Sequence, residues 1–194
     1  PYLRKHSLYH EFENLATKSE LEYFVFSVLR NPMEIAVTVY EKMKANSKGN
    51  FTNTALFSEN GGHISKQQRQ RFNYIKDNNS SFQQYFKKFH QKPYDNLSSL
   101  TIDNCDFVIR YETIAEDYLL ALKNAGIDST KPLPVANKTV GKNNDLSTYY
   151  TNDIKEISIA VFGPFLEKYN YSFPEEWGAV KIPLKSKFEF LVLG

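Results

Sequence analysis

The sequence predicts an α/β domain in which helices flank a parallel sheet. Two apolar stretches of strand length, Tyr23–Leu29 and Asp106–Tyr111, are each followed by a segment with helical periodicity. Strands that alternate with helices across long connections are typical of layered α/β domains. The chain has 194 residues, which is enough for one domain with a core of its own and too few for two of ordinary size.

The first expected unit is a strand, a tight turn and a helix. Tyr23–Leu29 is rich in aromatic and β-branched residues, as is typical of a strand buried on both faces. The run stops at Arg30. Asn31 then suits a helix N-cap, Pro32 the first helical turn and Glu34 the third position of a capping box. Apolar residues continue at helical spacing, at Ile35, Val39 and Met43.

The middle of the chain, residues 45–100, is polar and rich in Asn, Gln, Ser and Lys. Its patterns predict two helices, near Lys66–Lys76 and Ser81–Phe89. Two histidines of this region, His63 and His90, are expected to be exposed because their surroundings are polar.

The second strand, Asp106–Tyr111, precedes an acid-rich helix start, and Gly126 is a natural C-cap for that helix. Proline, glycine and asparagine in Asp128–Leu146 predict a loop. A last helix is expected from about Thr151 to Tyr169, and residues 178–194 form a C-terminal tail.

Composition excludes several functions. The net charge of +2 gives little electrostatic attraction to nucleic acid, so no nucleic-acid partner is expected. The single cysteine, Cys105, allows no intrachain disulfide, and no Cys/His cluster has the spacing of a zinc site. No run approaches the length of about 20 apolar residues that a transmembrane helix needs. The aromatic content of 15% favours a core rich in aromatic side chains.

Arg30 is the first candidate for binding chemistry. It stands at the carboxyl end of a predicted strand, where open α/β sheets bind ligands, and just before a helix N-terminus, which attracts anions. Thr38 lies near the same face of the following helix, so that an arginine and a hydroxyl could clamp a phosphate. The alternative, an arginine that caps a strand and a threonine that packs in a helix, is equally compatible with these residues.

This same segment closely resembles the 3′-phosphate-binding segment of sulfotransferases that use 3′-phosphoadenosine 5′-phosphosulfate (PAPS). In that family an apolar strand ends in Arg-Asn-Pro and a Ser follows eight residues after the Arg; Arg30, Asn31, Pro32 and Thr38 match here. The resemblance implies that Arg30 and Thr38 bind the 3′-phosphate of the donor. Thr in place of Ser keeps the hydroxyl, whereas Ile35 stands where the family often has a second Arg.

Further segments resemble the carbohydrate and membrane-associated sulfotransferases. They are the strand–helix Asp106–Ile127, the Asn-Lys-Thr loop in Leu133–Thr139, and Tyr149–Phe173 with its Tyr-Tyr-Thr helix start. The resemblance implies a sulfotransferase-like domain over residues 1–177 with a P-loop-like sheet. Residues 45–100 match little, as expected of a region that varies with the acceptor.

The opening of the chain resembles the Lys-His-Ser/Thr segment of bacterial relatives. Sulfuryl transfer to a hydroxyl needs a group that takes the acceptor proton, and histidine titrates nearest to neutral pH. The resemblance implies His6 as this base, with His10 next, and Lys5 as a phosphate contact. Lys138 and Lys142 are candidates to face the donor or an anionic sugar. A solvated surface role is the alternative for these histidines and lysines.

One family feature has no counterpart. Family members carry near the N-terminus a Lys-x-Gly/Ala-Thr-Thr/Ser loop that cradles the 5′-phosphosulfate, and no segment of this chain resembles it. Either an upstream segment has been lost or this branch has abandoned donor binding. The chain begins without Met or a signal peptide, which favours the first, so we expect a fragment whose sheet is incomplete at the N-terminus and exposes an edge.

The expected function is direct transfer of a sulfuryl group from PAPS to a hydroxyl of a carbohydrate or glycan, with no metal. A bacterial cytoplasmic location is favoured over the Golgi lumen. A second hypothesis is a non-catalytic relative that binds glycan, nucleotide or protein. A third is a kinase-like P-loop enzyme, although its Gly-rich Lys-Ser/Thr loop is also absent.

Overall fold

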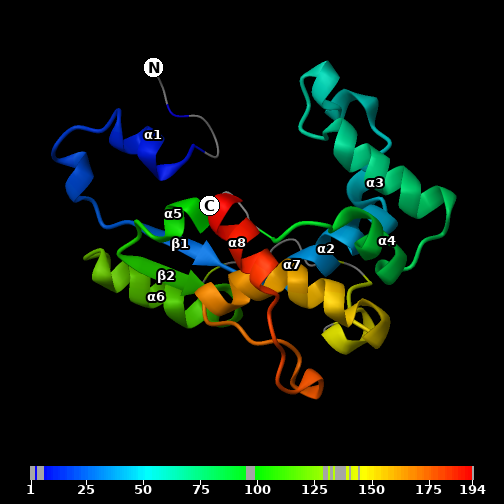
Figure 1. Ribbon diagram of the computed structural model, residues 1–194. Coiled ribbons are helices and arrows are strands. Elements are labelled where there is room, and N and C mark those ends of the chain that lie inside the picture. Colours follow the sequence, from blue (N-terminus) through cyan, green and yellow to red (C-terminus); the bar gives the residue numbers. More distant parts are fainter. Residues whose placement is uncertain are drawn as a thin grey trace. The chain divides into compact units, whose positions relative to one another are not determined.

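The computed structural model describes residues 3, 7–94, 99–128, 131, 133, 139, 141–143 and 145–193 (Figure 1). The fold is mixed α/β with a two-stranded parallel sheet. The chain divides into two compact units, and each is described by itself. The first comprises Pro1–Asn31, Asp95–Ala136 and Leu193–Gly194, and the second comprises Pro32–Tyr94 and Asn137–Val192. Among the described residues, none of the helices combines the length and the apolar composition that a membrane span requires.

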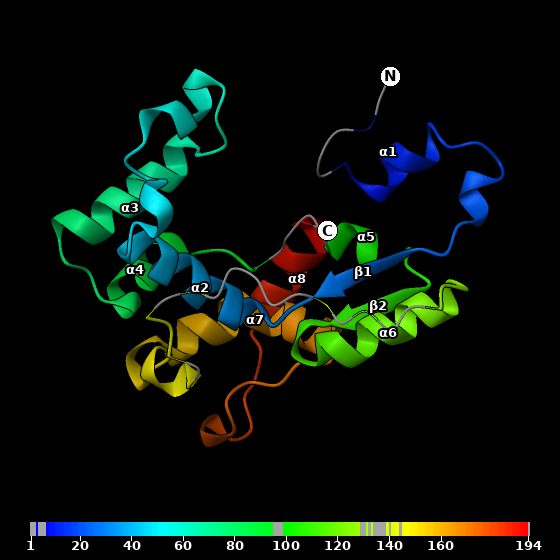
Figure 2. The ribbon, with the colours of Figure 1, turned by 180° about the vertical axis from the view of Figure 1, so that it is seen from behind.

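The first unit is built on the parallel strands β1 (Phe26–Leu29) and β2 (Phe107–Arg110), paired in register from Phe26 with Phe107 to Leu29 with Arg110. Helix α6 (Ile114–Asn124) packs on β2 and α5 (Ser99–Ile102) contacts β1, and these helices lie on opposite sides of the strand pair (Figure 2). Both predicted strands are therefore confirmed. The unit also contains α1 (Tyr9–Glu13) and the 3-10 turns Glu20–Glu22 and Tyr111–Thr113.

Strand β1 is shorter and more exposed than the sequence predicted. Only four residues of the run Tyr23–Leu29 form the strand, and Tyr23 is 61% exposed. Phe26 and Val28, which point to one face, are 40% and 41% exposed, so the prediction of burial on both faces is wrong. Among the described residues β1 pairs with β2 alone, and a two-stranded parallel sheet lacks the neighbours that bury such a strand.

Helix α6 ends as predicted. Gly126 adopts a left-handed conformation with φ of +74°, and the N–H of Ile127 donates to the carbonyl of Leu122 at 2.9 Å. This is the hydrogen bond of a glycine-terminated helix, and a residue with a Cβ would be strained at this position.

The second unit is organised around α2 (Pro32–Lys44), which contacts the helices α3, α4 and α7. The predicted helices of the polar middle are confirmed: Ser65 and Ser81 each form a capping box with a glutamine three residues later. The C-terminal region contains a helix that sequence analysis did not predict. The bounds are α3 (Lys66–Asp77), α4 (Phe82–Phe89), α7 (Lys155–Lys168) and α8 (Leu184–Leu193), with 3-10 turns at Ser47–Gly49, Thr54–Leu56, Ser58–Asn60, Leu146–Thr148, Asn152–Ile154 and Glu175–Trp177.

Aromatic side chains form the core of the second unit, as the composition predicted. Phe82 of α4 lies at the centre of this aromatic cluster, and its ring contacts five other rings. The centroid distances are 5.0–6.4 Å, and several pairs meet edge to face, an arrangement that stabilises beyond simple burial. The neighbours are Tyr40, Tyr85, Phe86, Tyr149 and Tyr150.

Two tyrosines of the aromatic cluster direct their hydroxyls at backbone carbonyls. Tyr40 Oη donates to the carbonyl of Ser80 at 2.8 Å, and Tyr150 Oη donates to the carbonyl of Met33 at 2.8 Å. Burial raises the pKa of Tyr40 to about 12 and the pKa of Tyr150 well above its usual value. Both hydroxyls therefore remain protonated donors, and their burial is compensated by hydrogen bonds.

His90 is not the exposed residue that the sequence predicted, although His63 is exposed. The imidazole of His90 stacks on Phe86 with centroids 4.5 Å apart, and its Nδ1 atom is buried. Burial lowers the pKa of His90 to about 4, and the positive charge of Arg71 contributes in the same direction. The prediction is wrong because it used the polar composition of the whole region. Helix α4 has an apolar face, and His90 packs against it.

Substitution of Tyr150 by Phe should destabilise the protein by about 1–2 kcal/mol, because a buried hydroxyl–carbonyl hydrogen bond is lost. Urea denaturation of the variant and of a matched control, Tyr23→Phe at an exposed position, measures the difference. Equal denaturation midpoints for the two variants would contradict this role of Tyr150.

His90 should make stability depend on pH. Its pKa in the folded protein is about 4, below the unfolded value of about 6.5, so the unfolded state binds the proton first as pH falls. The contribution of the neutral imidazole is complete above pH 6.5 and is lost progressively between pH 6.5 and 4. The stability difference between wild type and His90→Gln should shrink by about 1–3 kcal/mol from pH 7 to pH 4.5. A stability difference that stays constant with pH would contradict the buried neutral state.

Candidate functional site

The candidate site lies in the first unit, where β1 and β2 end at the same edge of the sheet. Leu29 of β1 is opposite Arg110 of β2, so the residues that directly follow the two strands are Arg30 and Tyr111. The guanidinium carbon of Arg30 lies over the Tyr111 ring, 4.1 Å from its centroid. This cation–π contact holds Arg30 at the carboxyl end of the sheet, where α/β proteins bind ligands.

Carboxylates fix the backbone at this edge. The N–H of Asn31 donates to Glu112 Oε1 at 3.0 Å, and the N–H of Arg110 donates to Asp117 Oδ2 at 2.8 Å. Thr113 Oγ1 also donates to Asp117 Oδ2, at 2.9 Å. The strand ends are therefore tied to the segment that begins α6, which restricts the position of Arg30.

Arg30 and Glu112 give this edge both signs of charge. An arginine that stacks through its face presents its N–H groups in the plane of the guanidinium, which is the geometry that recognises phosphate or carboxylate. The Glu112 carboxylate opposes an anion, although one of its oxygens already accepts the Asn31 N–H. The edge is suited to a single oxyanion group next to Arg30 rather than to a highly charged ligand.

The other predicted residues are divided between the units. His10 is exposed on α1 in the first unit, whereas Thr38 lies on α2 in the second and is 8% exposed. Lys5, His6 and Lys138 lie outside the described residues. The predicted pairing of Arg30 with Thr38 and the role of His6 as a base therefore remain predictions.

Lys142 belongs to the second unit, where its Nζ lies 3.3 Å from Glu34 Oε2. The two side chains are largely buried, at 12% and 28% exposure, so the carboxylate neutralises much of the lysine's charge. Glu34 stands in the first turn of α2. Lys142 thus has a structural partner that sequence analysis did not foresee, because the pair joins residues far apart in the chain.

Tyr149 is a second residue whose role was missed. Its hydroxyl donates to Glu41 Oε1 at 3.0 Å and accepts the N–H of Asn143 at 3.0 Å. Burial raises the pKa of Tyr149, and the hydrogen bond to Glu41 contributes in the same direction. The hydroxyl therefore stays neutral and holds the segment that carries Lys142 against α2. The adjacent tyrosines Tyr149 and Tyr150 were noted only as part of a family motif.

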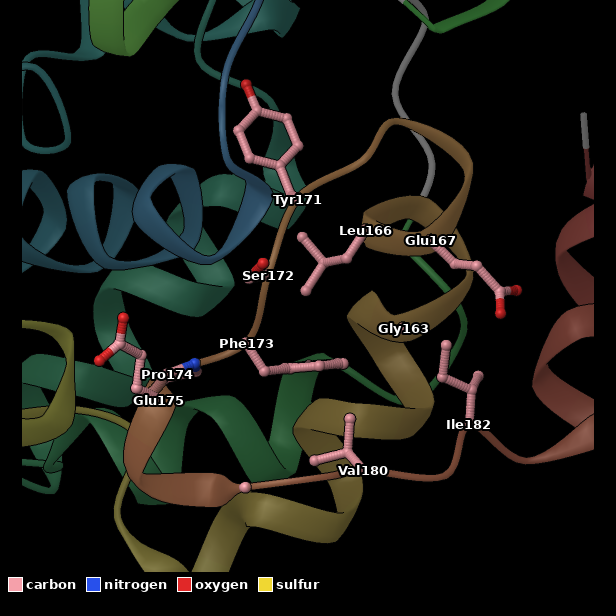
Figure 3. Close-up of a pocket in the computed structure, with 11 residues that line it drawn as sticks. Gly163, Leu166, Glu167, Tyr171, Ser172, Phe173, Pro174, Glu175, Val180 and Ile182 are labelled. Atoms are coloured by element: carbon pink, nitrogen blue, oxygen red, sulfur yellow. The ribbon is translucent and has the colours of Figure 1, made fainter.

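A hollow of about 420 Å³ lies in the second unit, between α7 and the segment that follows it (Figure 3). Leu166, Phe173, Val180 and Ile182 surround it, and Gly163 allows close packing because a Cβ there would lie 2.8 Å from Ile182. The described residues that line it include two carboxylates and no basic side chain, so it is unsuited to the phosphates of a nucleotide.

The first unit has an apolar hollow of its own, of about 480 Å³, between the N-terminal segment and β1. Leu8, Phe12, Phe24 and Phe26 contribute to its wall, and again the described lining residues include no cation. Among the described residues there is no group of three or more His, Cys, Asp or Glu side chains able to hold a metal ion.

The chain matches no protein-family model, and it shows no significant similarity to curated proteins or to solved structures. The proposed function therefore rests on the sequence motifs and on the geometry of the strand-end site.

Replacement of Glu112 by Ala should lower the free energy of unfolding by about 0.5–1.5 kcal/mol, because the Asn31 N–H loses a charged acceptor. The matched control is Glu116→Ala, an exposed position on α6. Urea denaturation of both variants measures the effect, and an equal loss in the two would show that Glu112 does not fix the end of β1.

Proposed function

We propose that the chain is a sulfotransferase domain that moves a sulfuryl group from PAPS to a hydroxyl of a carbohydrate or glycan. The observation that carries the proposal is the position of Arg30. It belongs to an Arg-Asn-Pro sequence, follows β1 directly and is held at the carboxyl edge of a parallel strand pair by Tyr111. Arginine at such an edge is suited to a phosphate group.

We further propose that β1 and β2 belong to a P-loop-like parallel sheet. The parallel pairing, the helix that follows each strand and the exposed Phe26 and Val28 support this reading, because parallel sheets are normally buried by further strands and helices.

In the proposed reaction Arg30 and Thr38 hold the 3′-phosphate of the donor. His6, or else His10, takes the proton of the acceptor hydroxyl, whose oxygen forms a bond to sulfur. The bond between sulfur and the 5′-phosphate oxygen breaks in the same in-line step, and 3′-phosphoadenosine 5′-phosphate leaves. Lys5, Lys138 or Lys142 would stabilise the charge that develops on the leaving group.

A non-catalytic relative is the second candidate. The pairing of Lys142 with Glu34 favours it, because a neutralised lysine contributes little to the stabilisation of a developing negative charge. Such a relative would retain the nucleotide-binding arginine and lose transfer.

Titration calorimetry of 3′-phosphoadenosine 5′-phosphate into the full chain tests the proposal. Wild type should bind the nucleotide at micromolar concentration, and Arg30→Ala should weaken binding about a hundredfold, because a charged arginine–phosphate interaction is lost. The nucleotide affinity of Arg30→Lys should lie between those of wild type and Arg30→Ala, since lysine keeps the charge and loses the planar guanidinium that donates two parallel hydrogen bonds.

The matched control is Lys123→Ala, which removes an exposed positive charge of the same unit. Folded wild type that does not bind the nucleotide, or equal losses in Arg30→Ala and Lys123→Ala, would overturn the assignment. Arg30-dependent binding without transfer from PAPS to a panel of glycans would favour the non-catalytic relative.

A further inference from the structure

Three polar side chains meet in the second unit without the hydrogen bonds that buried groups normally make. They are Arg71 of α3, Tyr85 of α4 and His90, which follows α4. Arg71 Nε, Tyr85 Oη and His90 Nδ1 are each buried, and none has a hydrogen-bond partner among the described residues. Tyr85 as a whole is 0% exposed. Unpaired buried polar atoms are rare in native proteins, and three in one place point to a missing partner.

The three groups share one location. The rings of Tyr85 and His90 have centroids 5.5 Å apart, and the guanidinium carbon of Arg71 lies 5.5 Å from the ring centroid of Phe89, at the end of α4. Burial raises the pKa of Tyr85 while the nearby charge of Arg71 opposes that rise, and the same charge lowers the pKa of His90. Arg71 is therefore close to both, and the Phe86 carbonyl is close to the His90 imidazole, although neither contact has the geometry of a hydrogen bond.

The chemistry of the cluster identifies what is missing. Arg71 Nε and the Tyr85 hydroxyl are donors, and His90 Nδ1 is a donor in one of the two neutral tautomers of the imidazole. The carboxylates Glu59 and Asp153 pair with Arg69 and Lys87. The cluster thus holds one positive charge and buried polar atoms to which no described carboxylate is hydrogen-bonded.

We propose that Arg71, Tyr85 and His90 form a binding site for an oxyanion group, a sulfate or a carboxylate. Arg71 and His90 are both partly exposed, although the three polar atoms themselves are buried. It lies within residues 45–100, which match the sulfotransferase pattern little, and under the proposed function it would hold an acidic substituent of the glycan. The anion site itself does not depend on that function.

Inorganic sulfate, glucuronate and neutral glucose, titrated into the full chain at constant ionic strength and pH 7, test the site. The readouts are the NMR signals of the His90 imidazole and the Tm. Saturable shifts with sulfate or glucuronate, and none with glucose or chloride, are expected. Binding of sulfate alone would assign the site to a free tetrahedral anion, and binding of glucuronate would assign it to an acidic sugar.

Three variants separate binding from structure. Tyr85→Phe should leave the Tm of the ligand-free protein unchanged or raise it, because the hydroxyl has no partner there, and should weaken anion binding about tenfold. Arg71→Gln should abolish binding. Lys66→Gln removes an exposed charge of the same helix and should bind like wild type.

The proposal is overturned if wild type shows no saturable shift, or if Arg71→Gln and Lys66→Gln respond alike. A lower Tm for Tyr85→Phe without any anion effect would instead show that bound water fills the cluster. Because Arg71→Gln leaves Arg30 intact, nucleotide binding in that variant reports separately on the proposed function.

Discussion

The second unit depends on the burial of α2 among aromatic side chains whose hydroxyls are hydrogen-bonded. A buried tyrosine is stabilising only when its hydroxyl is hydrogen-bonded to an acceptor. Here the carbonyl of Met33 in α2 accepts from Tyr150, and the carbonyl of Ser80 accepts from Tyr40. The first bond joins α2 to the segment before α7, and the second joins α2 to the residue before the cap of α4. The arrangement of helices that packs α2 is therefore also the one in which the tyrosine hydroxyls make their hydrogen bonds.

Two further contacts extend this arrangement to the loop that precedes α7. Glu34 pairs with Lys142, and Glu41 accepts a hydrogen bond from Tyr149, so the polar positions of α2 fix the segment that carries these two residues. In the first unit Glu112 and Asp117 have a similar role, because they accept hydrogen bonds from backbone N–H groups where β1 and β2 end. In the second unit Glu34 also neutralises much of the charge of Lys142.

Local patterns predicted most of the elements. The helices predicted near Lys66–Lys76 and Ser81–Phe89 correspond to α3 and α4, Gly126 marked the end of α6, and the apolar runs marked both strands. Contacts between distant residues were not predictable, since the pairing of Glu34 with Lys142 has no local signal. The exposure of β1 and the burial of His90 were missed for the same reason: burial depends on how many neighbours pack on an element, and composition alone does not give that number.

Arg30 could be named as a candidate from the sequence alone because Arg30, Asn31 and Pro32 are contiguous, whereas the cluster around Arg71 combines two helices and has no motif. Amide hydrogen exchange of the full chain, with and without 3′-phosphoadenosine 5′-phosphate, is the most direct test of a donor site at Arg30. Such a site predicts slower exchange in peptides from Phe26–Lys44, with exposed amides of α6 unchanged. Unchanged exchange over Phe26–Lys44 at saturating nucleotide would contradict it.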